Sequence, residues 1–284
     1  MKRVRLPRDA DEVLVGVGRV IAIANQKGGV GKTTTAVNLA VALAAAGRRV
    51  LLVDLDPQGN ATSGLTIVRD GDQSAVHLKT VYDALVVGVP FHEIVREVRA
   101  GLFLAAGGGD LVGAEIELAT MEGREQRLRT LLGSISPEYN YVLIDTPPSL
   151  GILTLNALVA ADTVLVPMQC EYYALEGLTS LMATIDRVRA GMNARLELEG
   201  IVLTMFDPRN NLAHQVAEEV RRHFHVFESV IPRNVRLSEA PSHGKPALLY
   251  DVQSKGAQGY LSLAHEVLAR EAPLAKTRTE RIAR

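Results

Sequence analysis

The sequence predicts an α/β fold in which a single doubly wound, mostly parallel sheet is flanked by helices. The first observation behind this prediction is that short apolar runs, typical of buried strands, alternate with longer segments that have the apolar spacing of helices. The second is that glycine-rich or acidic segments follow several of these runs, at the sheet edge where open α/β folds bind ligands. The third is size, because 284 residues, 47% of them hydrophobic, can bury one large core.

Each predicted element follows from its local pattern. Residues 20–24 are an apolar run that predicts the first strand, and the alanine-rich run after the next glycines predicts a helix. Strand and helix patterns then repeat, which implies parallel βαβ units, and Pro273 ends the last helix. In chain order the other predicted elements are a strand at 50–53, short helices at 80–88 and 91–99, a strand at 102–106, a loop at 107–109, helices at 111–121 and 124–132, strands at 141–144 and 163–167, a helix at 175–190, a strand at 201–205, a helix at 212–224 and a closing helix from about 258 to 270.

The predicted domain organisation has three parts. Residues 1–18 form an N-terminal extension, residues 19–270 a single domain, and residues 271–284 a basic C-terminal tail. Both ends of the chain carry local positive charge. We interpret them as solvated tails, with a DNA-contacting arm as the alternative. The basic residues concerned are Lys2, Arg3, Arg5, Arg8, Arg270, Lys276, Arg278, Arg281 and Arg284.

Charge, hydropathy and cysteine content restrict the function further. The formal net charge is −1, so any contact with nucleic acid must come from a local patch. No uncharged apolar segment of about 18 residues is present, and the first residues lack the apolar centre of a signal peptide, so a cytosolic protein is predicted. Cys170 is the single cysteine, which excludes an internal disulfide or a cysteine-pair metal site and indicates a packing role.

The segment at 25–34, Asn-Gln-Lys-Gly-Gly-Val-Gly-Lys-Thr-Thr, joins the first strand to the first helix and is suited to binding phosphate. Its glycines let backbone N–H groups close around phosphate oxygens, and the following helix directs its positive dipole end at the same charge. Lys32 adds a cation, and the Thr33 hydroxyl can ligate the Mg²⁺ that accompanies a nucleoside triphosphate. Gln26 replaces the first glycine of the usual Walker A pattern, and a second lysine, Lys27, follows it.

Two further strands end in carboxylates. Asp54 and Asp56 follow the run at 50–53, and extended geometry would let both face one side, where one can serve the water shell of the metal and the other can orient an attacking water. The run at 141–144 ends in Asp145, which has the form of a Walker B strand with a metal-side aspartate. Each motif alone could be an ordinary strand-end turn, but the three in this order predict nucleotide binding.

The stretch at 27–33, Lys-Gly-Gly-Val-Gly-Lys-Thr, resembles the deviant Walker A signature of the ParA/Soj and MinD superfamily of P-loop NTPases, whose members are dimerising ATPase switches. The segments at 54–60, 204–211 and 231–246 look like those of ParA/Soj segregation ATPases, and the resemblance covers about residues 19–270. It implies an ATPase of weak intrinsic activity that uses ATP and Mg²⁺ in chromosome or plasmid partition. It also implies a homodimer in the ATP state, binding of double-stranded DNA without sequence preference, a ParB-type partner that stimulates hydrolysis, and a cytoplasmic, nucleoid-associated location.

The resemblance also implies roles for single residues. Lys27 would reach across the dimer to the partner's nucleotide, Lys32 would hold the β- and γ-phosphates, and Asp56 would position the hydrolytic water, so these three are the implied catalytic residues. Arg209 and Arg236 would face the DNA backbone, although each alone could be an ordinary solvated charge. The residues implied to bind ATP are Lys27, Gly28, Gly29, Val30, Gly31, Lys32, Thr33, Thr34, Pro232 and Asn234, and those implied to lie at the metal are Thr33, Asp54 and Asp145.

Three rival functions can be weighed against the same sequence. A MinD-like membrane switch needs a terminal amphipathic helix, and the tail at 271–281 contains a proline and too few large apolar residues to insert, so no membrane partner is predicted. A reductase of the nitrogenase iron-protein type needs two cysteines per subunit to share a cluster, and one is present. A metabolic ligase, such as a dethiobiotin-synthetase-like enzyme, stays open, although Arg209 and Arg236 favour DNA.

Overall fold

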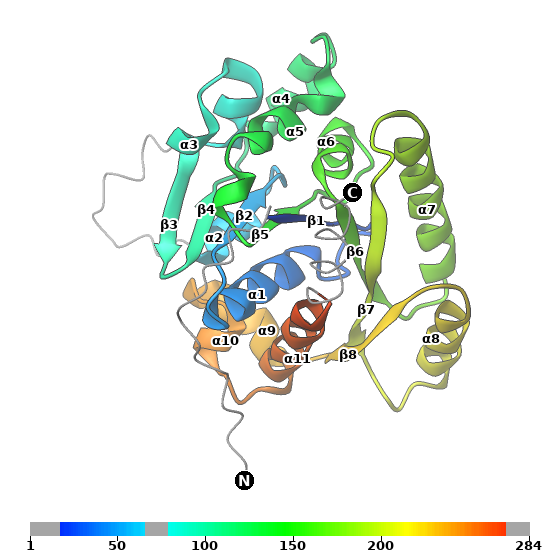
Figure 1. The fold of residues 1–284 in the computed structure, drawn as a ribbon. Helices are drawn as coiled ribbons and strands as arrows, with labels where there is room; N and C mark the ends of the chain where they lie inside the picture. The colour runs from blue at the N-terminus through cyan, green and yellow to red at the C-terminus, as the bar shows by residue number, and fades with distance from the viewer. Residues whose placement is uncertain (1–17, 66–78, 271–284) are drawn as a thin grey trace, which may run out of the picture.

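An eight-stranded sheet runs through the molecule in the order β3-β4-β2-β5-β1-β6-β7-β8 (Figure 1). The computed structural model describes residues 18–65 and 79–270. Neighbouring strands are parallel except at one edge, where β3 pairs with β4 in the antiparallel sense. The predicted α/β class with a mostly parallel sheet is therefore confirmed. The strands are β1 (Arg19–Ile23), β2 (Val50–Asp54), β3 (Val95–Arg99), β4 (Leu102–Ala105), β5 (Tyr141–Asp145), β6 (Thr163–Gln169), β7 (Glu197–Phe206) and β8 (Val226–Pro232).

Helices cover both faces of the sheet. One face packs against α1, α2, α10 and α11, and the other against α4, α5, α6, α7 and α8. The helices are α1 (Lys32–Ala45), α2 (Asn60–Leu65), α3 (Phe91–Ile94), α4 (Leu111–Leu118), α5 (Arg127–Gly133), α6 (Ile152–Ala160), α7 (Ala174–Gly191), α8 (Asn211–His223), α9 (Val235–Glu239), α10 (Ala247–Tyr250) and α11 (Lys255–Ala269).

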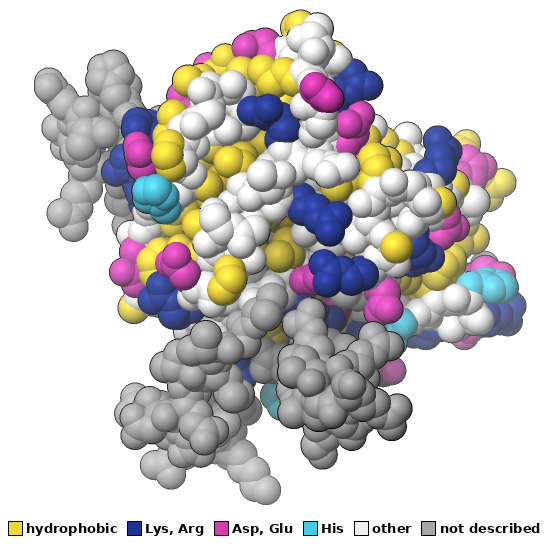
Figure 2. Space-filling model, turned by 45° about the horizontal axis from the view of Figure 1, so that its top comes forward, with side chains coloured by type: hydrophobic (Ala, Val, Ile, Leu, Met, Phe, Trp, Pro, Cys, Tyr) yellow, Lys and Arg dark blue, Asp and Glu magenta, His cyan; other side chains and the backbone are white. Residues whose placement is uncertain are grey.

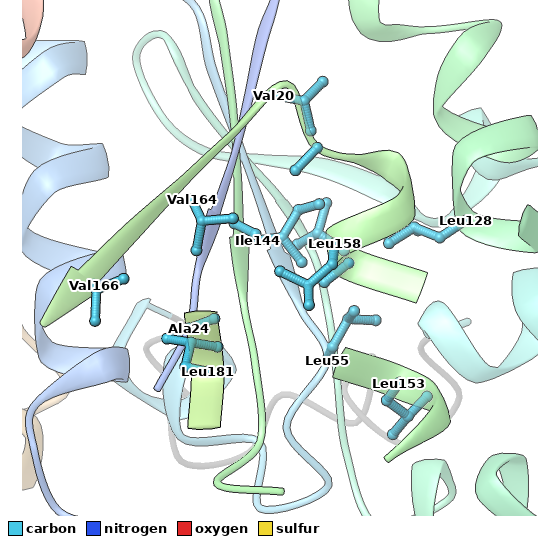
Figure 3. Close-up of a cluster of buried hydrophobic side chains, with 14 of the residues drawn as sticks. Val20, Ala24, Leu55, Leu128, Ile144, Leu153, Leu158, Val164, Val166 and Leu181 are labelled. Carbon is cyan, nitrogen blue, oxygen red and sulfur yellow. The ribbon is translucent and has the colours of Figure 1, made fainter. Parts of the chain in front are cut away.

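The central strand β1 shows why its sequence is apolar throughout. Val20 and Ala22 share one core with α6 and α7, whereas Ile21 and Ile23 share the other with α1 and α11. Successive side chains of a strand point to opposite faces, so a strand covered on both sides must be apolar at every position. Figure 3 shows the first of these cores, in which side chains from β1, β5 and β6 meet Leu158 of α6.

The carboxyl ends of the central strands bring the predicted motifs together. In the strand register, Asp145 at the end of β5 lies opposite Ile23 of β1 on one side and Asp54 of β2 on the other. The glycine-rich segment leaves β1 at this same edge. The three motifs, the first and last of which are more than a hundred residues apart in the sequence, therefore meet where parallel strands end.

The helix predicted at 91–99 is wrong in its second half. Helix α3 ends at Ile94, and Val95–Arg99 form β3, whose Val95 pairs with Ala105 of β4. The left-handed Gly101 (φ 74°) closes the hairpin between the two strands. Arg96 and Glu97 are exposed on β3, as charged side chains on an edge strand commonly are, and this charge hides the strand pattern in the sequence.

Other elements differ in extent or were not predicted. Helix α11 begins at Lys255, before the predicted residue 258, because the Ser254 hydroxyl accepts a hydrogen bond from the Ala257 amide (3.2 Å) and caps it. The helix at 80–88 is largely a π-helical turn, Asp83–Val87. Strand β8 and helices α2, α6, α9 and α10 were not predicted; α6 is buried on most sides and has no polar face to reveal its period, and α2, α9 and α10 are too short for a periodic pattern.

No helix in the described part of the chain is long and apolar enough to cross a membrane. Residues 1–17 and 271–284 lie outside the described residues, so the predicted N-terminal extension and basic tail stay predictions.

Candidate functional site

The loop between β1 and α1 has the geometry that a phosphate site needs. Gly29 (φ 75°) and Gly31 (φ 87°) adopt left-handed conformations that favour glycine, and α1 begins at Lys32 with no acidic residue in its first turn. The loop is also held from β7, since the Thr204 hydroxyl donates to the Val30 carbonyl (2.8 Å). Backbone N–H groups and the positive end of the α1 dipole are therefore available to an anion.

Lys32 is buried at the base of this loop. It is 6% exposed, and its Nζ donates to the Lys27 carbonyl (3.2 Å). Burial lowers the pKa of Lys32, while the nearby charges of Asp145 and Asp56 oppose that shift. The ammonium group is thus held close to the two carboxylates, and its role in holding the terminal phosphates stays a prediction.

The side chain of Lys27 is held differently from that of Lys32. Its side chain forms an ion pair with Glu171, which follows β6, and both side chains are partly exposed. Its backbone N–H donates to Asn25 Oδ1 (3.0 Å), and Asn25 Nδ2 donates to the Pro167 carbonyl of β6 (2.8 Å). The loop and the β6–α7 connection are therefore tied together. Glu171 was not predicted, although the signal that identified Asp145, an acid shortly after an apolar strand, is present here too.

Asp54 is fully buried and engaged by neighbouring groups. Its Oδ2 accepts from the Thr62 amide (2.8 Å) and hydroxyl (2.7 Å), and its Oδ1 accepts from the Asp56 amide (3.1 Å). Burial raises the pKa of Asp54, and the hydrogen bonds from Thr62 lower it. The Gly107 amide donates to the Thr62 hydroxyl (2.9 Å), and a Cβ at Gly107 would lie 2.4 Å from the Asp54 carbonyl oxygen. Thr62 thus belongs to the site, and no pattern in the sequence pointed to it.

Asp145 is the carboxylate that best fits a metal ion. It is fully buried, and neither of its oxygens has a hydrogen-bond partner of regular geometry among the described residues. Burial raises the pKa of Asp145 well above its usual range and the charge of Asp54 adds to this, while the Thr33 hydroxyl and Lys32 act in the opposite direction. A buried, unpaired carboxylate beside a hydroxyl at the end of a phosphate loop is the donor set expected for Mg²⁺.

Asp56 lies at the mouth of the same site. It is 7% exposed, and its Oδ1 accepts from the Gln58 amide (2.9 Å), which fixes the turn that Gly59 (φ 61°) completes. Its charge acts on both Lys32 and Asp145. The structure therefore brings Asp56 close to Lys32 and Asp145, and its role in orienting a water stays a prediction.

The predicted DNA-binding and adenine residues lie at the end of β8 and on the connections after β7 and β8. These strand ends are neighbours, because Phe206 pairs with Pro232. Arg209 is 88% exposed, and its guanidinium donates to both oxygens of Asp207 (3.0 and 2.9 Å). Asn234 caps α9, so its Oδ1 already accepts a hydrogen bond within the chain.

Arg236, on the first turn of α9, is also paired. It forms ion pairs with Glu239 (2.9 Å) and Asp251 (3.4 Å). The face seen in Figure 2 has Lys and Arg side chains interspersed with Asp and Glu rather than gathered into one continuous patch. Both predicted DNA-binding arginines thus carry local counter-charges.

Cys170 is a packing residue, as predicted. It is 5% exposed within the core beneath α7 and α8. Burial raises the pKa of its thiol to about 11, which leaves almost no reactive thiolate near neutral pH.

Comparison with known proteins agrees with this geometry. The protein family described as "AAA domain" matches residues 18–198. The chromosome partitioning protein ParA of Myxococcus xanthus is 57% identical over 261 residues, which cover 90% of each chain, and the sporulation initiation inhibitor protein Soj of Bacillus subtilis is 54% identical over 256 residues, which cover 89% of this chain and 99% of Soj.

Two solved structures with nucleotide have the same fold. Cobyrinic acid a,c-diamide synthase from Mycobacterium smegmatis, with a bound ATP analog and magnesium, has a TM-score of 0.75 at 37% identity over 89% of this chain and 95% of that one. A putative plasmid partition protein from Borrelia burgdorferi, bound to AMPPNP, has a TM-score of 0.75 at 27% identity over 89% of this chain and 99% of that one. With its two-lysine loop, its cluster of buried carboxylates and relatives identical at more than half of the aligned positions, the chain belongs to the ParA/Soj family of chromosome-partitioning ATPases.

Proposed function

We propose that this chain is a DNA-segregation switch, in which an ATP-bound dimer binds DNA without sequence preference and a ParB-type partner stimulates hydrolysis and release. The observation that carries the proposal is the different exposure of its two lysines. Lys32 is buried at the start of α1, whereas Lys27 stands partly exposed at the edge of the loop. One lysine serves the nucleotide of its own subunit, and the other is available for the nucleotide of a second copy.

Different residues of the nucleotide site bind the phosphates, the metal ion, the attacking water and the adenine. The loop amides and Lys32 bind the terminal phosphates, and Thr33 and Asp145 hold Mg²⁺, with Asp54 next to them and ordered by Thr62. When bound, the ion neutralises negative charge on the phosphates. Asp56 orients the attacking water. Pro232 and Asn234, at the end of β8, contact the adenine.

The dimer forms through the edge of the sheet that carries the loop. Tyr172 and Tyr173 directly follow Glu171 at this edge and are 72% and 66% exposed. Large exposed apolar side chains next to a functional site mark an interaction surface. They support a contact between two copies beside Lys27.

The DNA surface consists of Arg209 and Arg236, at the ends of neighbouring strands. Two copies in one dimer double the number of phosphate contacts. A chain of net charge −1 can therefore bind a polyanion through this local surface. The protein would then act in the cytoplasm, on the nucleoid, and its hydrolysis alone would be slow.

The test is steady-state ATP hydrolysis by the full chain alone, with duplex DNA, and with DNA plus the ParB-type protein of the same organism. We expect slow hydrolysis alone and stimulation in the last mixture. Lys27→Ala and Lys32→Ala are a matched pair, since only the second should lose nucleotide binding. Absence of stimulation by DNA and partner together would refute the proposal.

A small-molecule ligase is the second candidate. The Mycobacterium smegmatis protein named cobyrinic acid a,c-diamide synthase is 37% identical. A ligase would hydrolyse ATP in response to a small carboxylate or amine substrate and not to DNA. The 57% identity to the Myxococcus xanthus ParA favours partition.

A further inference from the structure

Three arginines lie together where β7 and β8 end. Arg209 follows β7, Arg233 directly follows β8, and Arg236 lies on the short helix α9 after it. The two strand ends pair, and the Arg233 amide donates to the Phe206 carbonyl (3.4 Å), so all three belong to one surface. Arg209 and Arg236 were predicted to bind DNA from the sequence, whereas Arg233 was not.

Two of these arginines are already neutralised within the chain. Asp207 accepts both hydrogen bonds of the Arg209 guanidinium, and Arg236 lies between Glu239 and Asp251. Three carboxylates therefore accompany three arginines on this surface, so its formal charge is near zero. A phosphate that binds Arg209 or Arg236 has to approach a carboxylate or separate it from its arginine.

Arg233 is different. Its side chain is exposed, and within residues 18–65 and 79–270 it forms no ion pair. It still lies close enough to Asp207 for its charge to lower the pKa of that carboxyl, after the larger effect of the Arg209 hydrogen bonds. A polyanion can therefore meet Arg233 without displacing a carboxylate, at a point next to the Arg209–Asp207 pair.

We propose that Arg233 is a further phosphate-binding residue of the DNA surface, and that Asp207 weakens DNA binding by holding Arg209. This proposal rests on the DNA binding proposed above. It adds Arg233 as a contact and states that the neighbouring carboxylate of Asp207 lowers DNA affinity. Because the surface is balanced internally, its affinity for DNA is low. Such affinity suits a protein that must leave DNA again.

The first test is a salt series of DNA binding by the full chain with Mg²⁺ and a non-hydrolysable ATP analogue, on unrelated duplexes. Each phosphate contact contributes about 0.9 to the slope of log K against log salt, so Arg233→Ala should reduce the slope by about two in a dimer. Arg233→Lys should retain most of the slope. Arg187→Ala is the matched control, because Arg187 is an exposed arginine near the end of α7, which leads to the amino end of β7, whereas Arg209 and Arg233 follow carboxyl ends of strands.

The second test is Asp207→Asn, which removes the negative charge. Asparagine keeps the side-chain oxygen that accepts the Arg209 amide (3.0 Å), so the turn is retained. We expect DNA affinity to rise several-fold, with ATP-dependent dimerisation unchanged.

The outcomes separate this inference from the proposed function. A wild-type chain that binds no DNA with the ATP analogue refutes the proposed function itself. If the wild type binds DNA and Arg233→Ala binds it with the same affinity and the same salt slope as the wild type, Arg233 does not contact DNA. Loss of dimerisation or nucleotide binding in Arg233→Ala would also overturn the assignment, and unchanged or weaker DNA binding by Asp207→Asn would refute the competition by Asp207.

Discussion

The ion pair between Lys27 and Glu171 should oppose dimerisation, and its strength sets how much it raises the dimer dissociation constant. If Lys27 must reach a nucleotide in the other subunit, it has to leave Glu171 first. The Lys27 side chain is 36% exposed and the Glu171 side chain 45%, so water screens the pair. Pairs of this kind contribute about 0.2–1 kcal/mol each. Two pairs open when one dimer forms, which costs about 0.4–2 kcal/mol and corresponds to about a 2- to 30-fold change in the dimer dissociation constant.

Glu171→Gln removes the charge and keeps the size of the side chain. We expect its dimer dissociation constant to fall by this factor with Mg²⁺ and a non-hydrolysable ATP analogue, while affinity for the nucleotide is unchanged. Sedimentation equilibrium measures the first quantity, and titration calorimetry the second. The difference between variant and wild type should shrink as salt is raised, because salt screens exposed charges.

The matched control is Glu176→Gln, which makes the same charge change at an exposed position in the first turn of α7. It should dimerise like the wild type. A Glu171→Gln dimer as weak as that of Lys27→Ala would mean that Glu171 stays on Lys27 and positions it in the dimer. Either that result or an unchanged dissociation constant would refute the reasoning.

Four further predictions concern the nucleotide site and the core. Lys32→Ala should abolish ATP binding in a fluorescent-nucleotide assay, and Lys27→Ala should retain it while losing dimerisation; equal loss in both would contradict their separate roles. Asp56→Ala should accumulate as an ATP-bound dimer on size exclusion, and a variant that binds ATP but stays monomeric would refute its role in hydrolysis. Asp145→Asn should stabilise the nucleotide-free protein at pH 7, because it removes a carboxylate whose charged form is disfavoured by burial and by the charge of Asp54. Because the folded-state pKa of Asp145 is raised, this gain should grow as pH rises above the unfolded value of about 3.9 and vanish below it, which urea unfolding across pH would test. Cys170, with a pKa of about 11, should resist alkylation at pH 8 until the chain is unfolded, and rapid labelling of the folded protein would contradict its burial.

The phosphate loop and its carboxylates were predictable because each sits in a local strand-end pattern. Residues 25–34, Asp56 and Asp145 are read directly from the glycine spacing and from acids that follow apolar runs. Parallel pairing then forces these ends to one edge of the sheet, so their meeting in space follows from the fold class. The strand register confirms that step for Asp54 and Asp145.

What could not be predicted was how each of these groups is partnered. Glu171 is 144 residues from Lys27 along the chain, and nothing local indicates their ion pair. Thr62 was missed because a threonine in a short helix carries no special pattern. Asp207 could have been noticed, since it lies two residues from Arg209 and the turn between them favours contact. An ion pair within the chain determines whether a charged side chain can bind a ligand. The sequence therefore indicated which charged residues are present, but not which of them are already paired.

The carboxyl end of β7 connects the phosphate loop to the surface proposed for DNA. Thr204 donates its hydroxyl to the Val30 carbonyl of the loop, and three residues later Asp207 holds Arg209. Between them Met205 has a left-handed φ of 49°, in contrast to all the other described residues with positive φ, which are glycines. A side chain in this conformation is unfavourable and persists only where its surroundings impose it. Met205 is flanked by the loop contact of Thr204 on one side and by the pairing of Phe206 with Pro232 on the other. Met205 is therefore a strained residue of β7 that lies between the contact to the phosphate loop and the strand end that precedes the arginines.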